Sequence, residues 1–370
     1  MQNLKIKRNI SLFILLFINL IFSIKYISRY YEHYLVISLI LTLALFTIVT
    51  LSKKFSSLLS SIKIKPTYLL YFFCLVLLFV SHKIPLEALK IDRWSVITSF
   101  WDNYFNNLYV YKAKSFDGNN PGPMPFYFIL MLPFYLIKEF SYITVLGVLF
   151  FYYFIKPEHS RKTYIYLIIL SIPIAYEIVS RSNIFFNSFL VLFSLKYFIE
   201  KQDNLIIKSI LIGLLLSTRN VFIITYGIVF IYSLKHKKNS FANILKIGLY
   251  SILIFSLTFI PFTYNHIYEF WQINPFKIQS SALLPFNYSL FCIIISVSLA
   301  YFIQKKEDIY FLSGISLFIT IIIYFIYWSI NKDFYVAFFG SYADITYFIF
   351  CMPFLIYYYL ETKNPDENRD

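Results

Sequence analysis

Long apolar runs, separated by short polar segments, follow one another along almost the whole chain. A helix needs about 20 apolar residues to cross a bilayer, and helices inside a packed bundle are often shorter. The pattern therefore predicts an all-α, polytopic integral membrane protein with a single transmembrane domain over residues 1–370. The apolar runs are residues 10–24, 34–51, 67–81, 126–137, 141–155, 163–177, 183–199, 205–217, 220–234, 241–262, 285–303, 308–329 and 342–360.

Two of these runs set the number of crossings. Residues 124–137 contain Pro133 and would form a helix only about 21 Å long, so we expect a re-entrant or surface segment there. Residues 205–234 would span about 45 Å as one helix. A polar break at residues 217–220 interrupts them, so we expect a hairpin. About 12 transmembrane helices follow, with both termini in the cytoplasm.

The composition supports this class, because 59% of the residues are hydrophobic and only 14% are charged. A net charge of +14 suggests nucleic acid as a partner. Nucleic-acid binding needs a contiguous basic face, however, and these Lys and Arg residues lie singly or in small clusters between apolar runs. They instead orient the chain in a plasma (bacterial inner) membrane. The external or periplasmic face then carries residues 82–140, 177–181, 219, 261–284 and 330–341.

Several kinds of site are excluded. Cys74, Cys292 and Cys351 lie inside apolar runs, which indicates buried apolar side chains rather than disulfides or metal ligands. The sequence has no metal-ligand spacing, so neither a metal nor another cofactor is expected. It has 8 glycines and no glycine-rich phosphate loop. A substrate carried by a membrane lipid is therefore favoured over one carried by a nucleotide.

Residues 82–140 form the longest polar stretch. Apolar positions 94, 97, 100, 101, 104, 105 and 108 trace one face of a helix over residues 94–109. With two Trp on that face, the helix is expected to lie flat among the lipid headgroups, and packing against the bundle is the alternative. At the other end of the chain, residues 361–370 are expected to be a disordered cytoplasmic tail.

Asp92 stands at the start of this amphipathic helix, beside Arg93. A neighbouring positive charge favours the ionised carboxylate, which can accept a proton from an attacking hydroxyl. Asp92 is therefore the candidate catalytic base, and an N-cap is the structural alternative. Asp102, on the polar face of the helix, and Asp117, in an Asp-Gly turn, are weaker candidates.

Candidate phosphate ligands lie in the same loop and at two later breaks. The basic and amide side chains are Arg93, Lys112, Lys114, Asn119, Asn120, Arg181 and Arg219. Arg219 is the strongest, because a guanidinium matches the oxygens of a phosphate. Glu177 lies four residues before Arg181, a spacing at which residues of one helix face each other. Asp344, at the start of the last apolar run, is a candidate to pair with an Arg or to bind a sugar.

Three segments resemble the polytopic glycosyltransferases of the GT-C fold, which use polyprenyl-phosphate-linked sugars. The first is Ile91-Asp92-Arg93-Trp94 with the helix after it. The second is the Pro-rich turn at residues 119–126, and the third is residues 214–220 with Arg219. The resemblance is specific over about residues 85–140. It implies an acidic catalytic residue at the start of the first large external loop, followed by interfacial helices.

Our leading hypothesis is an integral-membrane glycosyltransferase with Asp92 as general base. It would transfer a sugar from a polyprenyl phosphate to a glycan, lipid or protein on the external face. An O-antigen-type polymerase or ligase is one alternative, although such proteins usually carry their arginines in a late loop. A flippase or other transporter of lipid-linked saccharide is the second alternative. It would show a repeat of two halves and charges near the midplane.

Overall fold

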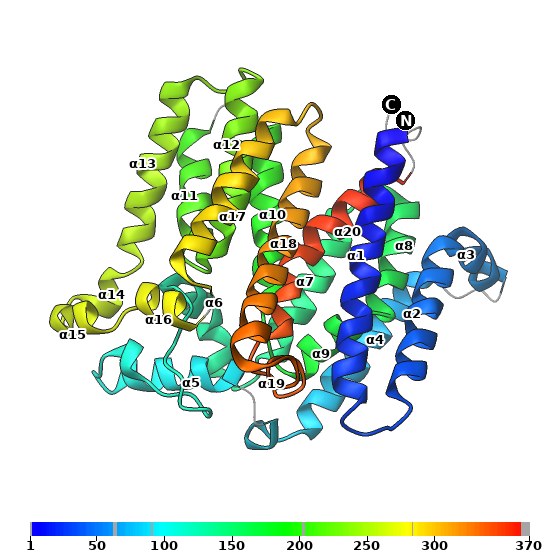
Figure 1. Cartoon of the computed structure of the whole chain (residues 1–370), viewed down its shortest axis with the longest axis horizontal. Helices are drawn as coiled ribbons and strands as arrows, with labels where there is room; N and C mark the ends of the chain where they lie inside the picture. Colours follow the sequence, from blue (N-terminus) through cyan, green and yellow to red (C-terminus); the bar gives the residue numbers. More distant parts are fainter. Residues whose placement is uncertain (1, 62–64, 90–91, 202–203, 283, 364–370) are drawn as a thin grey trace.

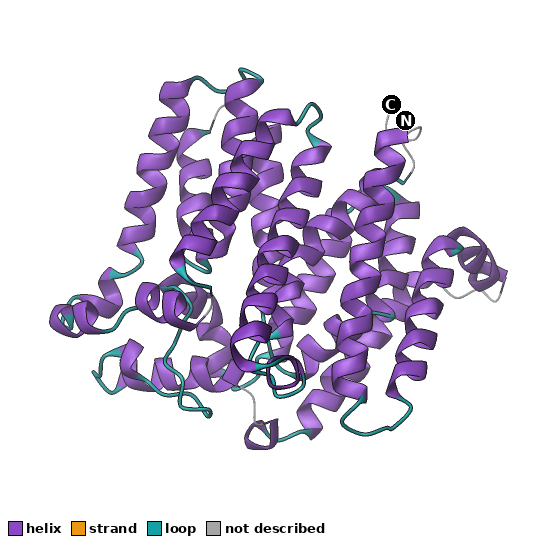
Figure 2. Ribbon diagram, viewed as in Figure 1, coloured by secondary structure: helices purple, strands orange, loops and turns teal. Residues whose placement is uncertain are grey.

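The chain is helical throughout the part that can be described. The computed structural model describes residues 2–61, 65–89, 92–201, 204–282 and 284–363, and within them it holds helices and loops but no strand (Figure 2). This confirms the all-α expectation. Of the expected disordered tail, residues 364–370 lie outside the described residues.

The helices follow the apolar runs closely. In chain order they are α1 (Gln2–Ile27), α2 (Tyr34–Thr50), α3 (Ser52–Ser61), α4 (Pro66–Lys83), η1 (Leu86–Leu89), α5 (Asp92–Phe105), η2 (Val110–Lys112), α6 (Pro125–Leu136), α7 (Ser141–Phe154), α8 (Glu158–Ile169), α9 (Ile172–Val179), α10 (Ile184–Glu200), α11 (Leu205–Leu216), η3 (Asn220–Phe222), α12 (Ile223–Lys235), α13 (Phe241–Leu257), α14 (Ile260–Thr263), α15 (Ile267–Gln272), α16 (Pro275–Ala282), α17 (Phe286–Leu299), η4 (Ala300–Phe302), α18 (Glu307–Lys332), α19 (Phe334–Phe338), η5 (Ile345–Cys351) and α20 (Met352–Glu361).

The long helices run roughly along one direction, and several of the short ones lie across one end of them (Figure 1). We call that end the loop end, and it holds α5, α14 to α16, α19 and the break at residues 217–219. We call the opposite end the terminal end. It holds the start of α1 and the end of α20, where Arg8 Nη1 donates to the Lys363 carbonyl at 3.4 Å.

Four helical segments are long and apolar enough to cross a membrane: Asn3–Ile27, Pro66–Lys83, Phe241–Thr263 and Glu307–Lys332. Two bent pairs, α6 with α7 and α8 with α9, raise the number to six if each pair is one span. Other apolar helices are shorter, at 10–17 residues. The chain is therefore built as a membrane-embedded helical bundle, whereas about 12 crossings remains a prediction.

The two runs that decided the expected topology differ: residues 125–136 form one short helix, α6, whereas residues 205–234 are broken. The axes of α6 and α7 meet at 113°, so α6 does not continue the direction of α7. This angle fits a broken span or a re-entrant segment. The break expected at residues 217–220 is confirmed, because α11 ends at Leu216 and α12 begins at Ile223. The two helices are joined at the loop end (Figure 1).

The expected amphipathic helix is α5, whose apolar face packs on protein. The Phe100 ring stacks on Phe128 of α6 with ring centres 3.6 Å apart, and Phe262 of α14 meets it edge-on at 5.1 Å. The Trp101 indole donates to the Phe128 carbonyl at 3.2 Å. The centre of this face therefore packs on the bundle, which was the alternative to lying among lipid headgroups. Tyr104 and Phe105 at its end are exposed, and so is Leu108, which lies beyond the last residue of α5 within the predicted range 94–109.

The helices α11 and α13 approach closely because a glycine faces the contact. A Cβ placed at Gly213 would lie 2.6 Å from the Ser251 carbonyl oxygen and 2.9 Å from Ile254 Cβ. The Ser251 hydroxyl also donates to the Ser209 carbonyl at 3.2 Å. Small residues that let backbones approach are a common way of packing membrane helices.

Gly213→Ala is expected to destabilise the bundle by about 1–3 kcal/mol, because the added methyl group collides with backbone rather than with a flexible side chain. Gly248→Ala on α13 is the matched control, since nothing lies within 4 Å of its Cβ position. The control should be neutral or slightly stabilising through helix propensity. Thermal unfolding of both detergent-solubilised variants measures this, and equal Tm values would contradict the packing.

Candidate functional site

The loop end brings together segments that the sequence separates widely. The Gln279 amide donates to the Gly122 carbonyl at 2.5 Å, and the Tyr109 hydroxyl donates to the Ile273 carbonyl at 2.8 Å. The Met124 backbone N–H donates to the Thr218 carbonyl at 3.3 Å. These contacts confirm that residues 82–125, the break at 217–219 and residues 261–284 share one end. Which side of the membrane that end faces stays a prediction.

Asp92 is the first residue of α5, and its carboxylate holds the turn at residues 115–119. Its Oδ1 accepts from the Ser115 hydroxyl at 2.5 Å and from the Asp117 backbone N–H at 3.1 Å. Its Oδ2 accepts from the Asn119 amide at 2.5 Å. Asp92 therefore binds a later loop segment. The structural alternative was an N-cap bond to its own helix, and the carboxylate is used for the loop instead.

The two weaker acidic candidates lie differently. Asp117 sits on the exposed turn, where partial burial and the nearby Asp92 carboxylate raise its pKa above the ordinary value. Asp92 and Asp117 thus form a pair of neighbouring carboxylates that the sequence spacing did not indicate. Asp102 lies on the exposed side of α5 and accepts from the Tyr135 hydroxyl at 2.6 Å. Asp102 therefore helps to hold α5 on α6.

Arg93 points in another direction from Asp92 and binds residues near the end of the chain. Its Nη2 donates to Asp344 Oδ2 and to the Thr346 hydroxyl, and its Nη1 donates to the Ser182 hydroxyl at 3.4 Å. The Arg93 side chain is 12% exposed and that of Asp344 is 36% exposed. Pairing with an arginine, one of the two roles expected for Asp344, is therefore confirmed, and the arginine is Arg93.

Asp344 is held in its charged form. Its Oδ1 accepts from the Thr346 backbone N–H at 2.9 Å and from the Thr346 hydroxyl at 2.6 Å, which caps η5. Burial by itself would raise the pKa of Asp344, but the Arg93 guanidinium and the bonds from Thr346 outweigh it and lower that pKa. The ion pair and the cap therefore keep this carboxylate ionised at neutral pH.

The expected pairing of Glu177 with Arg181 is wrong. The helix α9 ends at Val179, and Arg181 adopts a positive φ of 56°, so helical spacing does not extend to it. The buried Glu177 carboxylate instead accepts from the Phe185 backbone N–H at 2.9 Å, at the start of α10. Arg181 Nε lies 3.2 Å from Glu139, and its Nη2 donates to the Ser81 carbonyl at 2.8 Å.

Arg219 is a partly buried candidate whose side chain contacts an aromatic ring in the described chain. Its guanidinium lies 5.0 Å from the centre of the Tyr127 ring. Within the described part of the chain, its buried Nε has no hydrogen-bond partner and the side chain forms no ion pair. A buried polar group left in this state commonly marks the place of a water, an ion or a ligand.

The remaining phosphate candidates are mostly occupied within their own loop. Lys114 Nζ donates to Asn120 Oδ1 at 2.8 Å, and the Asn120 amide donates to the Tyr111 and Ala113 carbonyls at 3.0 and 3.1 Å. Asn119 is bound to Asp92. These side chains hold the loop in its conformation. Lys112, beside them in sequence, is exposed.

Arg93 and Arg219 share aromatic neighbours. Tyr127 and Tyr347 each interact electrostatically with both guanidinium groups. Arg93 also lies 5.9 Å from the centre of the Tyr347 ring. In the sequence, Tyr127 lies inside the apolar run 126–137. Its position beside two arginines could therefore not be predicted from its spacing. The contact of Glu139 with Arg181 was missed because the two residues lie 42 positions apart and no spacing relates them.

Among the described residues, no group of three or more His, Cys, Asp and Glu side chains is placed to hold a metal ion. Compared with known protein families, with characterised proteins and with solved structures, the chain gives no match. The resemblance to the GT-C fold therefore stays a prediction, and the site has to be interpreted from its own geometry.

The Arg93–Asp344 pair should contribute a coupling free energy of about 1–2 kcal/mol to folding, between the values of exposed and buried pairs. A double-mutant cycle of Arg93→Gln and Asp344→Asn, followed by thermal unfolding in detergent, measures it. Because the pKa of folded Asp344 is lowered, this stabilisation is present above a pH of about 4 and is lost as the pH falls further.

The exposed pair of Glu158 and Lys162, 2.8 Å apart, provides the control cycle. Its coupling should stay below about 0.5 kcal/mol, as for other exposed helical pairs. A coupling at Arg93–Asp344 no larger than this control would show that the ion pair does not hold the loop end together.

Proposed function

We propose that the chain is an integral-membrane glycosyltransferase. In this proposal it takes a sugar from a polyprenyl phosphate and passes it to a hydroxyl of a glycan, lipid or protein. The observation that carries the proposal is the state of Arg219, which has a buried Nε without a protein partner in the described chain and lies beside Tyr127 at the end of an apolar bundle. A guanidinium fork matches the oxygens of a phosphate in a bidentate geometry.

The charges around Arg219 support an anionic ligand. Lys25, Arg29 and Arg93 lie in electrostatic contact with the Asp344 region, and Arg219 joins them through Tyr347. The carboxylates nearby are Asp344 and Glu177. Four cations thus face two carboxyl groups. In a low-dielectric environment such a surplus stabilises the negative charge of a bound phosphate and of the polyprenyl phosphate that leaves.

Asp92 would supply the base. In glycosyl transfer the acceptor oxygen bonds to C1 of the sugar, the bond from C1 to the phosphate oxygen breaks, and the acceptor proton must be removed. A carboxylate offers about four acceptor positions, and Asp92 uses three of them for Ser115, Asp117 and Asn119. Its Oδ2 accepts from Asn119, and the side chain of Asp117 also hydrogen-bonds Asp92, so the acceptor would displace Asp117 to reach Oδ2. The turn at 115–119 would aim this oxygen at the acceptor.

The distribution of charge favours a transferase over a transporter of lipid-linked saccharide. A transporter binds its substrate near the bilayer midplane. Here the candidate residues Asp92, Arg93, Arg219 and Asp344 belong to segments that meet at the loop end of the bundle. A site at one end suits a reaction in which the lipid stays in the membrane while the acceptor arrives from the aqueous side.

Asp92→Asn is expected to lower the rate of sugar transfer by about 10²–10⁴-fold, because it removes the base while keeping an acceptor oxygen for the turn. The measurement is transfer from a radiolabelled polyprenyl-phosphate sugar in membranes that contain the variant. Full transfer by Asp92→Asn would remove Asp92 from the chemistry.

A second variant separates catalysis from loop positioning. Asn119→Ala removes one bond to Asp92 and leaves its carboxylate in place. Its transfer rate should fall by less than about tenfold, since a single hydrogen bond contributes on the order of 1 kcal/mol. An Asn119→Ala variant as slow as Asp92→Asn would instead assign Asp92 a purely structural role.

Arg219→Gln is expected to raise the KM for the lipid-phosphate donor by about tenfold or more, because a charge-assisted contact to phosphate is lost. Arg219→Lys should restore part of the effect, because it keeps the charge without the fork. The KM for the acceptor should stay unchanged in both variants. An equal rise in the KM of both substrates would argue against a phosphate contact at Arg219.

A further inference from the structure

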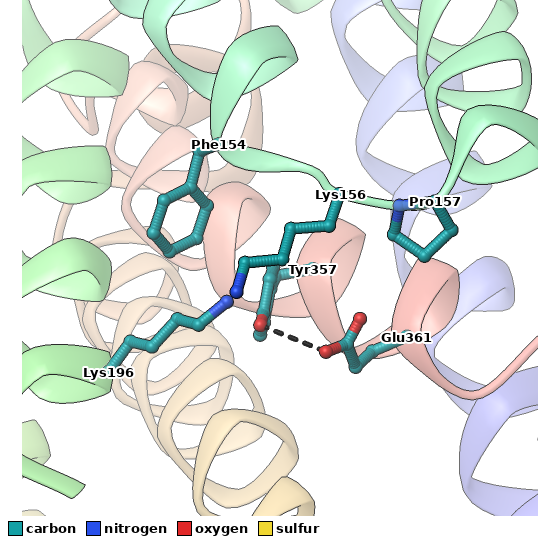
Figure 3. Close-up of a pocket in the computed structure, with 6 residues that line it drawn as sticks. All are labelled: Phe154, Lys156, Pro157, Lys196, Tyr357 and Glu361. Carbon is teal, nitrogen blue, oxygen red and sulfur yellow. Dashed lines mark hydrogen bonds between the residues drawn. The ribbon is translucent and has the colours of Figure 1, made fainter. Parts of the chain in front are cut away.

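A small cavity of about 80 Å³ lies at the terminal end, far along the bundle from the proposed transferase site. It lies between the end of α7, the start of α8, α10 and α20, and is lined by Phe154, Lys156, Pro157, Lys196, Tyr357 and Glu361 (Figure 3). A single water needs only roughly 10–15 Å³ of such space, so the cavity has room for a larger polar group.

Two lysines meet at this cavity. The side chains of Lys156 and Lys196 point toward one another, so that their ammonium groups lie close together (Figure 3). Lys196 is held between aromatic rings, with its Nζ 4.5 Å from the centre of the Phe154 ring and 5.1 Å from that of Tyr357. Two converging ammonium groups repel each other unless an anion lies between them.

The carboxylates nearby only partly neutralise this pair. Lys196 Nζ lies 3.9 Å from Glu200, and Glu361 accepts from the Tyr357 hydroxyl at 3.1 Å. A third cation, Lys306, also acts on Lys196. Within the described part of the chain Lys156 forms no ion pair. Glu158, in the first turn of α8, and Glu307, next to Lys306, also lie nearby. In the described part of the site, the ammonium group without a carboxylate partner of its own is therefore that of Lys156.

The surface next to the cavity is apolar. Phe150 and Tyr153, one turn or less before Phe154, are 49% and 57% exposed. Phe193, three residues before Lys196, is 42% exposed, and its ring centre lies 6.0 Å from that of Phe154. Exposed aromatic side chains of α7 and α10 thus lie close in sequence to the residues that line the cavity. Acyl chains suit such a surface when it faces lipid.

We infer that this cavity binds the headgroup phosphate of an anionic phospholipid. The phosphate would lie between the ammonium groups of Lys156 and Lys196, and the acyl chains would lie along Phe150, Tyr153 and Phe193. Basic pockets between membrane helices are suited to lipid phosphates. The adjoining apolar surface favours a lipid over free phosphate. This site shares no residue with the proposed transferase site, and its test does not depend on sugar transfer.

The test is lipid binding to the purified full chain, measured by native mass spectrometry. Phosphatidylglycerol is the anionic probe and phosphatidylcholine is the zwitterionic control. We expect phosphatidylglycerol to bind more tightly, and Lys156→Gln to raise its Kd by about tenfold or more through loss of one charged contact. Lys156 is exposed, so this variant is expected to fold. Lys196→Arg keeps the charge and should retain most of the binding.

Lys162→Gln is the matched control, because Lys162 is close in sequence but paired with Glu158 at 2.8 Å. Its Kd for phosphatidylglycerol should equal that of the wild-type chain. Equal affinity of Lys156→Gln and wild type would overturn the site, and so would equal binding of the two lipids. Displacement of phosphatidylglycerol by inorganic phosphate at matched concentration would overturn the lipid assignment and leave a site for free phosphate.

Discussion

The ion pair between Arg93 and Asp344 joins the helix after Asp92 to the segment before the last helix, across 251 positions of sequence. A chain with so few charged residues has few ways to tie its loop end together, because most of its contacts are apolar and non-directional. A guanidinium that binds a carboxylate and two hydroxyls specifies both distance and orientation. The same Asp344 carboxylate caps η5, and Arg93 also interacts electrostatically with Tyr127 and Tyr347 near Arg219.

The two ends of the bundle use cations in different ways. At the loop end, Arg93 and Arg181 are each paired with a carboxylate, whereas Arg219 forms no ion pair in the described chain. Arg181 Nη1 and Arg219 Nε are both buried without a hydrogen-bond partner there. At the terminal end, two lysines converge on a small cavity. At both ends a cation thus lacks a carboxylate partner in the described chain. In our two proposals, an anion binds to each of these cations.

Part of the candidate site could be predicted from sequence. The acid at the start of the loop, the amphipathic helix and the break before Arg219 were all found by their position relative to apolar runs. Their bonding partners were not. Asp92 holds the turn at 115–119, and Asn119 and Asn120 are occupied within their loop. Polar side chains in one loop can bind either a ligand or each other, and sequence order does not distinguish these outcomes.

The sequence by itself determined the helical, membrane-embedded class and the approximate helix bounds, because hydrophobic length and periodicity are properties of local segments. It also identified which polar segments share one end of the bundle. Only the tertiary structure decided that Arg93 pairs with Asp344, that Arg181 pairs with Glu139 in place of Glu177, and that α5 packs on α6. These contacts join residues distant in sequence, and a chain rich in similar aromatic helices permits many such pairings until packing selects one.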